Sequence, residues 1–268
     1  MGALLVGTQG WNYRHWVGPF YPHYIRPEDY LRSYARAFGT VEVDSTFYAV
    51  PPEDTVKGWA AKVPEQFRFA CKLPQEATHE RKLVDAHEVL DEFTTRMRTL
   101  GNRLGPILIQ LGPEFGPEYA PALERFLPLL PPDLRFAVEF RRRGWLRPPI
   151  LRRLAEHGVA VAMVEGRWLP REAMLRLAAE PTADFAYVRL MGPDRSIVDY
   201  SRVQVDRTAE LEAWVPALRA LADRLETVYV YVNNHFEGHS PSTARRLQKL
   251  LGQAVVEPDQ LADQGELF

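Results

Sequence analysis

The sequence is short of cysteine, of long apolar runs and of net charge, and each shortage excludes a class of protein. Cys71 is the single cysteine, which rules out an internal disulfide and any metal site built from several cysteines. No apolar run approaches the roughly 18 residues of a membrane span, and residues 1–7 are too short for the apolar core of a signal peptide. A formal net charge of −2 gives no overall attraction to nucleic acids or membranes. From these absences we expect a cytoplasmic protein.

The composition is that of an ordinary globular protein, with 46% hydrophobic and 25% charged residues in 268. A single compact domain of this length buries enough surface to fold without a disulfide or a metal. No linker, repeat or low-complexity segment divides the chain. We therefore expect one domain over residues 1–251, followed by a C-terminal tail over residues 252–268.

Strand and helix patterns alternate along the chain. Strands are predicted at residues 3–8, 41–44, 67–72, 106–111, 135–140, 159–164, 184–190 and 228–232. Helices are predicted at residues 27–38, 55–62, 84–100, 119–130, 149–157, 171–179, 208–225 and 240–251. Eight such units in roughly 250 residues predict a single (β/α)8 TIM-like barrel. An open doubly wound sheet is the alternative, but the chain lacks the glycine-rich first turn of that fold.

The second strand shows how polar groups collect at the strand ends. Val41 and Val43 alternate with Glu42 and Asp44, so one face is apolar and the other carries two acids. Because catalytic groups of such barrels lie at the C-terminal ends of strands, acids that point inward there mark a candidate site. The same alternation turns six polar residues inward, one from each of six strands: Glu42, Lys72, Gln110, Glu139, Arg189 and Asn233. The alternative is that these buried polar groups pair with one another for packing alone.

Seven motifs in order carry a resemblance to a known family. They read VGTQGWNY, VEVDSTFY, FACKLP with THER, IQLGPEF, FAVEFR with GW, YVRLMG and YVYVNN. Over residues 5–251 the chain resembles the YecE-like family, domain of unknown function 72. The resemblance implies an elongated TIM-like barrel whose reaction is not established, with a relation to sugar isomerases as a suggestion. Members usually carry Asn where this chain has Asp44, usually His at Arg142 and often His at Met191.

Three residues are predicted to be catalytic, namely Glu42, Lys72 and Glu139. Two carboxylates beside a lysine form a general acid–base set, since the lysine lowers the pKa of one acid. A structural Glu–Lys–Glu network is the alternative. A further hypothesis is that the Lys72 amine forms an imine with the ligand. Two nearby acids argue against it, because they would keep the amine protonated.

A second group of residues is predicted to bind the substrate: Trp11, Tyr48, His79, Gln110, Arg141, Arg189, Tyr231, Asn233 and Asn234. Barrels often hold phosphate between the loops after strands seven and eight and a helix N-terminus, which here begins at Ser240. An ordinary Ser-Pro helix cap is the alternative. The aromatic loop over residues 9–25 is predicted to be a lid that stacks on a ligand, a plug of the barrel end or a subunit contact.

The sequence does not decide whether the protein binds a divalent metal or a protein partner. Five residues are ligand types that Mg²⁺ or Mn²⁺ accept, although their spacing forms no metal motif: Glu42, Asp44, His79, Glu139 and Glu165. Residues 264–268 start with Gln264 and end with Leu267 and Phe268, which partly resembles the peptide motif that binds bacterial sliding clamps. Packing of Leu267 and Phe268 on the barrel is the alternative.

Three functions follow as hypotheses. The first is an enzyme acting on a small polar ligand, sugar-like or phosphorylated, at the C-terminal mouth of the barrel. The second is a protein of DNA metabolism recruited through its C-terminal tail, with a clamp or nucleic acid as the partner. The third is a barrel that binds a small molecule without turning it over.

Overall fold

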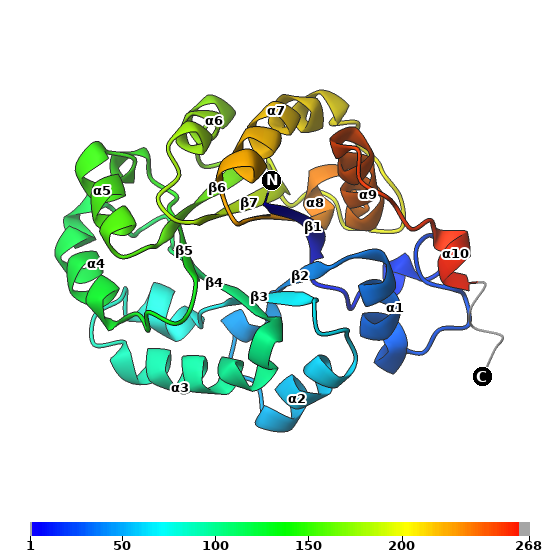
Figure 1. Ribbon diagram of the computed structural model, residues 1–268, viewed down its shortest axis with the longest axis horizontal. Helices are drawn as coiled ribbons and strands as arrows, with labels where there is room; N and C mark the ends of the chain where they lie inside the picture. Colours follow the sequence, from blue (N-terminus) through cyan, green and yellow to red (C-terminus); the bar gives the residue numbers. More distant parts are fainter. Residues whose placement is uncertain (1, 263–268) are drawn as a thin grey trace.

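The computed structural model describes residues 2–262, which fold into eight parallel strands closed into one barrel and surrounded by helices (Figure 1). The strands are β1 (Ala3–Gln9), β2 (Thr40–Val43), β3 (Arg68–Lys72), β4 (Leu104–Gln110), β5 (Phe136–Glu139), β6 (Ala160–Gly166), β7 (Phe185–Gly192) and β8 (Thr227–Val232). Each strand pairs with the next, and β8 closes the barrel on β1 from Ala3↔Thr227 to Thr8↔Val232. The predicted (β/α)8 barrel is confirmed.

The inward and outward faces follow the predicted alternation. Glu42 on β2 bonds to Tyr187 and Arg189 on β7, a strand on the far side of the barrel, so all three side chains point inward. Alanines and aromatic rings fill the interior: Ala70, Leu108, Ala137, Ala160, Ala162, Phe185, Tyr187, Tyr229 and Tyr231. The apolar residues between them face outward and pack under the helices.

The helices are α1 (Tyr30–Ala37), α2 (Glu53–Ala61), α3 (His87–Met97), α4 (Ala120–Phe126), α5 (Pro148–Glu156), α6 (Arg171–Ala179), α7 (Thr208–Arg224), α8 (Asn234–Glu237), α9 (Ser240–Leu251) and α10 (Pro258–Ala262). The helix predicted at residues 84–100 begins later, because Lys82, Leu83 and Asp85 have positive φ angles that a helix excludes. The short helices α8 and α10 were not predicted.

The segment predicted as a tail contains α10, which packs on α1. Arg36 donates to the carbonyl oxygens of Gln260 and Leu261 at 2.8 and 2.9 Å, and Tyr24 donates to that of Ala262 at 2.8 Å. Leu261 is buried beneath these contacts. Cationic and hydroxyl donors thus satisfy the last carbonyls of α10. The clamp-like motif of residues 264–268 lies outside the described residues.

The aromatic loop between β1 and α1 forms packed structure. Trp16, Phe20 and Tyr21 are fully buried, and Tyr21 stacks on Tyr30 with ring centroids 4.7 Å apart. Trp11 packs edge-on against Trp59 of α2, on the outer side of the barrel wall. These rings fill space between the barrel wall and the surrounding helices. No helix in the described part of the chain is long and apolar enough to cross a membrane.

Candidate functional site

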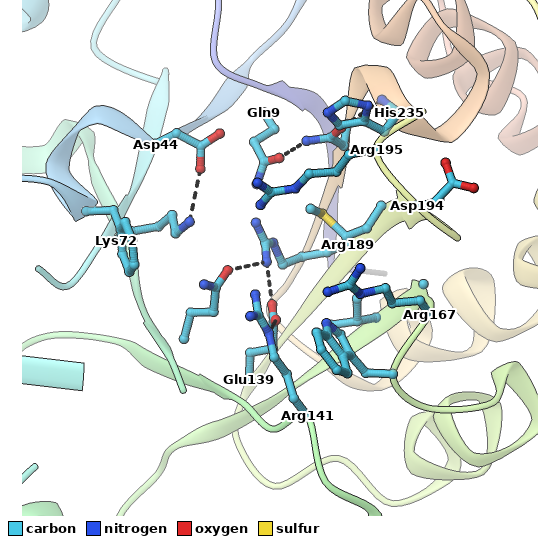
Figure 2. Close-up of a pocket in the computed structure, with 18 of the residues that line it drawn as sticks. Gln9, Asp44, Lys72, Glu139, Arg141, Arg167, Arg189, Asp194, Arg195 and His235 are labelled. Atoms are coloured by element: carbon cyan, nitrogen blue, oxygen red, sulfur yellow. Dashed lines mark hydrogen bonds and ion pairs between the residues drawn. The ribbon is translucent and has the colours of Figure 1, made fainter. Parts of the chain in front are cut away.

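A polar cavity of about 310 Å³ opens at the C-terminal mouth of the barrel (Figure 2). Its lining draws on the ends of β1 to β8 and the loops that follow them. The residues are Gln9, Tyr13, Asp44, Phe47, Tyr48, Lys72, Gln110, Glu139, Arg141, Val164, Gly166, Arg167, Trp168, Arg189, Met191, Gly192, Asp194, Arg195, Asn233 and His235. A cavity of this size accepts a small metabolite.

Arg189 forms the floor of the cavity (Figure 2). Its guanidinium donates to both oxygens of Glu42, with Nε–Oε2 at 2.9 Å and Nη2–Oε1 at 2.6 Å. Its Nη1 donates to Glu139 and, at 3.1 Å, to Gln110. Tyr187 adds a hydroxyl donor to Glu42 at 2.6 Å. The Arg189 side chain is 1% exposed, so this buried cation is held between two buried carboxylates.

Hydrogen bonds extend this floor on both sides. Gln9 donates to Glu42, and Asn233 donates to Gln9 while its oxygen accepts from the backbone N–H of His235 at 2.7 Å. On the other side Arg141 donates through Nε to Glu139 at 3.2 Å. The chain of contacts fixes every polar side chain of the floor in one arrangement.

Asp44 and Lys72 form one wall of the cavity. The Lys72 Nζ lies 3.3 Å from Asp44 Oδ1, and it sits over the Phe47 ring at 4.6 Å from the centroid. The buried hydroxyl of Thr46 accepts from the Lys72 N–H at 3.0 Å and donates to the Lys72 carbonyl at 2.8 Å. The backbone under Lys72 is therefore locked, while its ammonium faces the cavity.

Two of the acids that line the cavity, Asp44 and Glu139, have pKa values shifted in opposite directions. Burial raises the pKa of Asp44, against the opposing charge of Lys72. Burial alone would raise the pKa of Glu139 too, but Arg189 and Arg141 outweigh it and the pKa of Glu139 is lowered. Asp44 therefore releases its proton less readily than an ordinary aspartic acid, and Glu139 releases its proton more readily than an ordinary glutamic acid. Such a divergence is the physical basis of acid and base roles in one site.

The wall opposite Asp44 and Lys72 is cationic and aromatic (Figure 2). The guanidinium carbons of Arg167 and Arg141 lie 4.2 and 5.4 Å from the centroid of the Trp168 ring. Among the described residues neither Arg167 nor Arg195 has a carboxylate within 4.0 Å. Asp194 bonds instead to the backbone N–H and hydroxyl of Ser196. Five cationic and three acidic side chains line the cavity, so it is positive in a chain that is slightly negative overall.

Seven of the predicted site residues line the cavity: Tyr48, Lys72, Gln110, Glu139, Arg141, Arg189 and Asn233. Glu42 lies beneath the floor with no exposed surface. Lys72 pairs with Asp44, while the two glutamates that were expected to flank it bind Arg189. The predicted Glu–Lys–Glu set is therefore divided into two separate clusters.

The other four predicted site residues lie behind the lining. Trp11 packs outside the barrel wall, and Tyr231 is buried where its hydroxyl meets that of Thr40 at 2.8 Å. His79 packs edge-on against Phe47, and its Nδ1 lies 2.9 Å from the Thr78 hydroxyl. The fourth is Asn234, which is almost fully buried.

The helix N-terminus proposed as a phosphate cradle is occupied by the protein's own groups. The Asn234 side-chain oxygen accepts from the backbone N–H and the hydroxyl of Ser240, at 3.0 and 2.8 Å, and from the Trp16 indole at 3.2 Å. His239 caps the Ser242 N–H. The helix is capped by the protein itself, but His239 rather than Ser240 is the capping residue, so the expected Ser-Pro cap is wrong in its residue.

The residues suggested as metal ligands are spread over separate contacts. Glu165 pairs with Arg171 at 2.7 Å and accepts from the Trp214 indole at 2.9 Å, so it faces the helices. Glu42 and Glu139 bind Arg189. Within residues 2–262, no three His, Cys, Asp or Glu side chains gather in a group able to hold a metal ion.

Sequence reasoning did not place eight of the lining residues in the site: Gln9 at the end of β1, and Tyr13, Phe47, Arg167, Trp168, Asp194, Arg195 and His235 beyond strand ends. Most follow a strand by one to five residues, where alternation no longer reports direction. The available signal was the dense charge and aromatic content of these loops at predicted strand ends.

Comparison with known proteins assigns the family. The family described as "Protein of unknown function DUF72" matches residues 5–265. The chain belongs to this family. The predicted resemblance to YecE-like proteins is thereby confirmed.

Relatives within the DUF72 family carry no assigned activity in their names. The chain is 31% identical to UPF0759 protein YecE of Escherichia coli strain K12 over 169 residues, which span 61% of this chain and 60% of that protein. It is 26% identical to UPF0759 protein YunF of Bacillus subtilis, over 92% of this chain and 94% of that protein.

Solved DUF72 structures share the barrel. A DUF72 family protein of Thermotoga maritima superposes with a TM-score of 0.79 at 26% identity, covering 94% of this chain and all of that one. A DUF72 family protein of Enterococcus faecalis gives a TM-score of 0.73 at 22% identity, covering 95% and 99%, which supports the fold alone.

Proposed function

We propose that this DUF72 protein is an enzyme that binds a small phosphorylated, sugar-like molecule at the barrel mouth and moves a proton on it. The proposal rests on one cavity whose opposing walls carry different chemical groups. A carboxyl group with a raised pKa stands beside Lys72 on one wall, and arginines without carboxylate partners stand on the other.

The cationic wall suits a phosphate group. Guanidinium groups bind phosphate oxygens with paired N–H donors, and within residues 2–262 no carboxylate forms an ion pair with Arg167 or Arg195. Gln110 and Asn233 supply amide groups able to bond to the hydroxyls of a sugar-like ligand.

The remaining groups divide into reacting and positioning roles. Asp44 and Lys72 are the proton-transfer pair, since they are the titratable pair that faces the cavity without being held by Arg189. Glu139, kept ionised, binds hydroxyl or ammonium hydrogens of the ligand and holds Arg141. Glu42 positions Arg189 from below.

Ligand-induced stabilisation and hydrogen exchange test this proposal. Glycerol 3-phosphate, glucose 6-phosphate and their unphosphorylated forms are compared by thermal unfolding, since a ligand at 100 times its Kd adds about 2.7 kcal/mol to stability. Phosphorylated ketoses and aldoses are then incubated with the protein in D₂O, and NMR follows exchange of carbon-bound hydrogen. We expect stabilisation by phosphorylated compounds only, and exchange that Asp44→Asn abolishes while stabilisation remains.

Two results would change the proposed function. Stabilisation without exchange for any ligand would support the barrel that binds without turnover. Equal stabilisation by phosphorylated and neutral sugars would remove the role of the arginines. The matched control for Asp44→Asn is Asp91→Asn on the exposed face of α3, which makes the same charge change away from the cavity.

A further inference from the structure

Lys72 differs from every other lysine of the chain. The other four each have an oxygen within 3.0 Å: Lys57 on Glu53, Lys62 on the Glu28 carbonyl, Lys82 on Tyr119 and Lys249 on Glu257. Within residues 2–262, the one oxygen paired with the Lys72 ammonium is Asp44 Oδ1, at the longer distance of 3.3 Å. Its amine is thus the least engaged lysine nitrogen and the one that lines a cavity.

The surroundings of Lys72 are those of a reactive amine. Its side chain is 9% exposed and packs on the Phe47 ring, so little water surrounds the nitrogen. The bonds of Thr46 to the Lys72 backbone fix where the side chain starts. Desolvation and a rigid base favour a nucleophilic lysine.

The sequence-based objection to such a lysine was the presence of two acids, Glu42 and Glu139. Both carboxylates bind Arg189, and neither forms an ion pair with Lys72 within the described chain. Asp44 is the one carboxylate paired with the Lys72 ammonium, and burial raises the pKa of this acid, which makes it a better acceptor for the ammonium proton.

We propose that Lys72 forms a covalent imine with a carbonyl carbon of the ligand, with Asp44 as its proton shuttle. Asp44 takes one proton from the ammonium, and the freed amine attacks the carbonyl carbon to form a carbinolamine. Asp44 returns the proton to the oxygen, which leaves as water after a second proton moves from nitrogen to oxygen. The balance is ammonium plus carbonyl giving a protonated imine plus water, with no oxidant or reductant.

The substrate class is therefore a phosphorylated aldehyde or ketone, and this inference rests on the proposed function. The phosphate binds at Arg167 and Arg195, and the carbonyl reaches Lys72 across the cavity floor. A protonated imine acidifies the neighbouring C–H bond, which accounts for proton transfer by a site without a strong base. Aldol cleavage, dehydration and isomerisation all proceed through such an intermediate.

Reductive trapping tests the imine directly. The protein is incubated with dihydroxyacetone phosphate, reduced with sodium borohydride and digested, and mass spectrometry locates the modified lysine. Because the chain has only five lysines, each peptide can be assigned. We expect the reduced adduct at Lys72, competition by glycerol 3-phosphate and no adduct in Lys72→Arg. Lys57→Arg is the control and should be trapped like the wild type.

Asp44→Asn separates the shuttle from binding. We expect trapping at Lys72 to slow at least about tenfold while dihydroxyacetone phosphate still raises the unfolding temperature. Circular dichroism checks that each variant is folded. The peptide map of the wild-type protein locates the adduct, so the imine is also tested without relying on a variant.

The outcomes distinguish the two proposals. Stabilisation by dihydroxyacetone phosphate without an adduct at Lys72 would overturn the imine and leave the proposed function standing. Equal modification of all five lysines would also overturn it, as chance reaction of amines. Neither stabilisation nor adduct with any phosphorylated carbonyl compound would overturn both.

Discussion

Arg189 and Glu42 form a two-bond ion pair at the centre of the barrel, with side chains 1% and 0% exposed. The pair joins β7 to β2 across the interior and lies directly beneath the cavity. Glu139 shares the same guanidinium, so one permanently charged group holds two acids in place. The floor of the site is thus built before any ligand binds.

Glu42→Gln should destabilise the fold strongly. The substitution replaces a carboxylate that accepts two hydrogen bonds from the buried Arg189 with a neutral amide, while Glu139 still balances the guanidinium charge, and a hydrogen bond to a charged group contributes about 1.5–3 kcal/mol. The free energy of unfolding from urea titration measures this loss. Glu53→Gln, which breaks the exposed pair with Lys57, should leave it almost unchanged. Equal effects of the two substitutions would contradict a central role for the buried pair.

Arg195→Gln should weaken the binding of phosphorylated ligands. Loss of one charged donor costs about 1.5 kcal/mol or more, which corresponds to about a tenfold rise in Kd. Calorimetric titration with glycerol 3-phosphate measures it. Raising the salt concentration should narrow the difference, because Arg195 is exposed and its charge is screened. If Arg152→Gln on exposed α5 gave the same loss, general charge rather than the cavity would be responsible.

Asp44→Asn should change how stability depends on pH. The folded-state pKa of Asp44 is raised, so the folded protein holds this proton more tightly than the unfolded chain does. Wild-type stability therefore falls, relative to Asp44→Asn, as the pH rises from the ordinary value of 3.8 through the raised value. Urea titrations of both proteins at several pH values measure the difference. A constant difference across this window would show that the pKa of Asp44 is not raised.

Deleting residues 264–268 tests the predicted clamp partner. Binding of the intact chain to a purified bacterial sliding clamp is measured by calorimetry, and the deletion should abolish it. Replacing Leu267 and Phe268 with alanine should have the same effect, because these two side chains are the predicted apolar anchors. Failure of the intact chain to bind would end the hypothesis.

The fold and the site floor could be predicted because alternation along a strand reports direction. Inward-facing Glu42, Gln110, Glu139 and Arg189 do meet in the structure. Alternation does not report depth along the barrel axis, which depends on the stagger of the strands. For this reason the sequence could not separate Glu42, buried beneath the floor, from Glu139, which lines the cavity.

The walls of the site could not be predicted to the same degree. Arg167, Trp168 and Arg195 lie on loops, whose course depends on tertiary packing rather than on a period of two. Asp44 departs from the Asn that is usual in the family, and in the structure it is the partner of Lys72. The sequence left three roles open for the aromatic loop, and in the structure Trp16 and Phe20 pack internally while Tyr13 lines the cavity.

The docking of α10 on α1 has a consequence for how the molecule can be used. Figure 1 shows α10 outside the ring of helices, beside α1 and away from the strands of the barrel. Arg36 and Tyr24 fasten the described end of the chain there. A macromolecule held near Ala262 and a metabolite in the mouth would therefore occupy different space, and both could be bound at the same time.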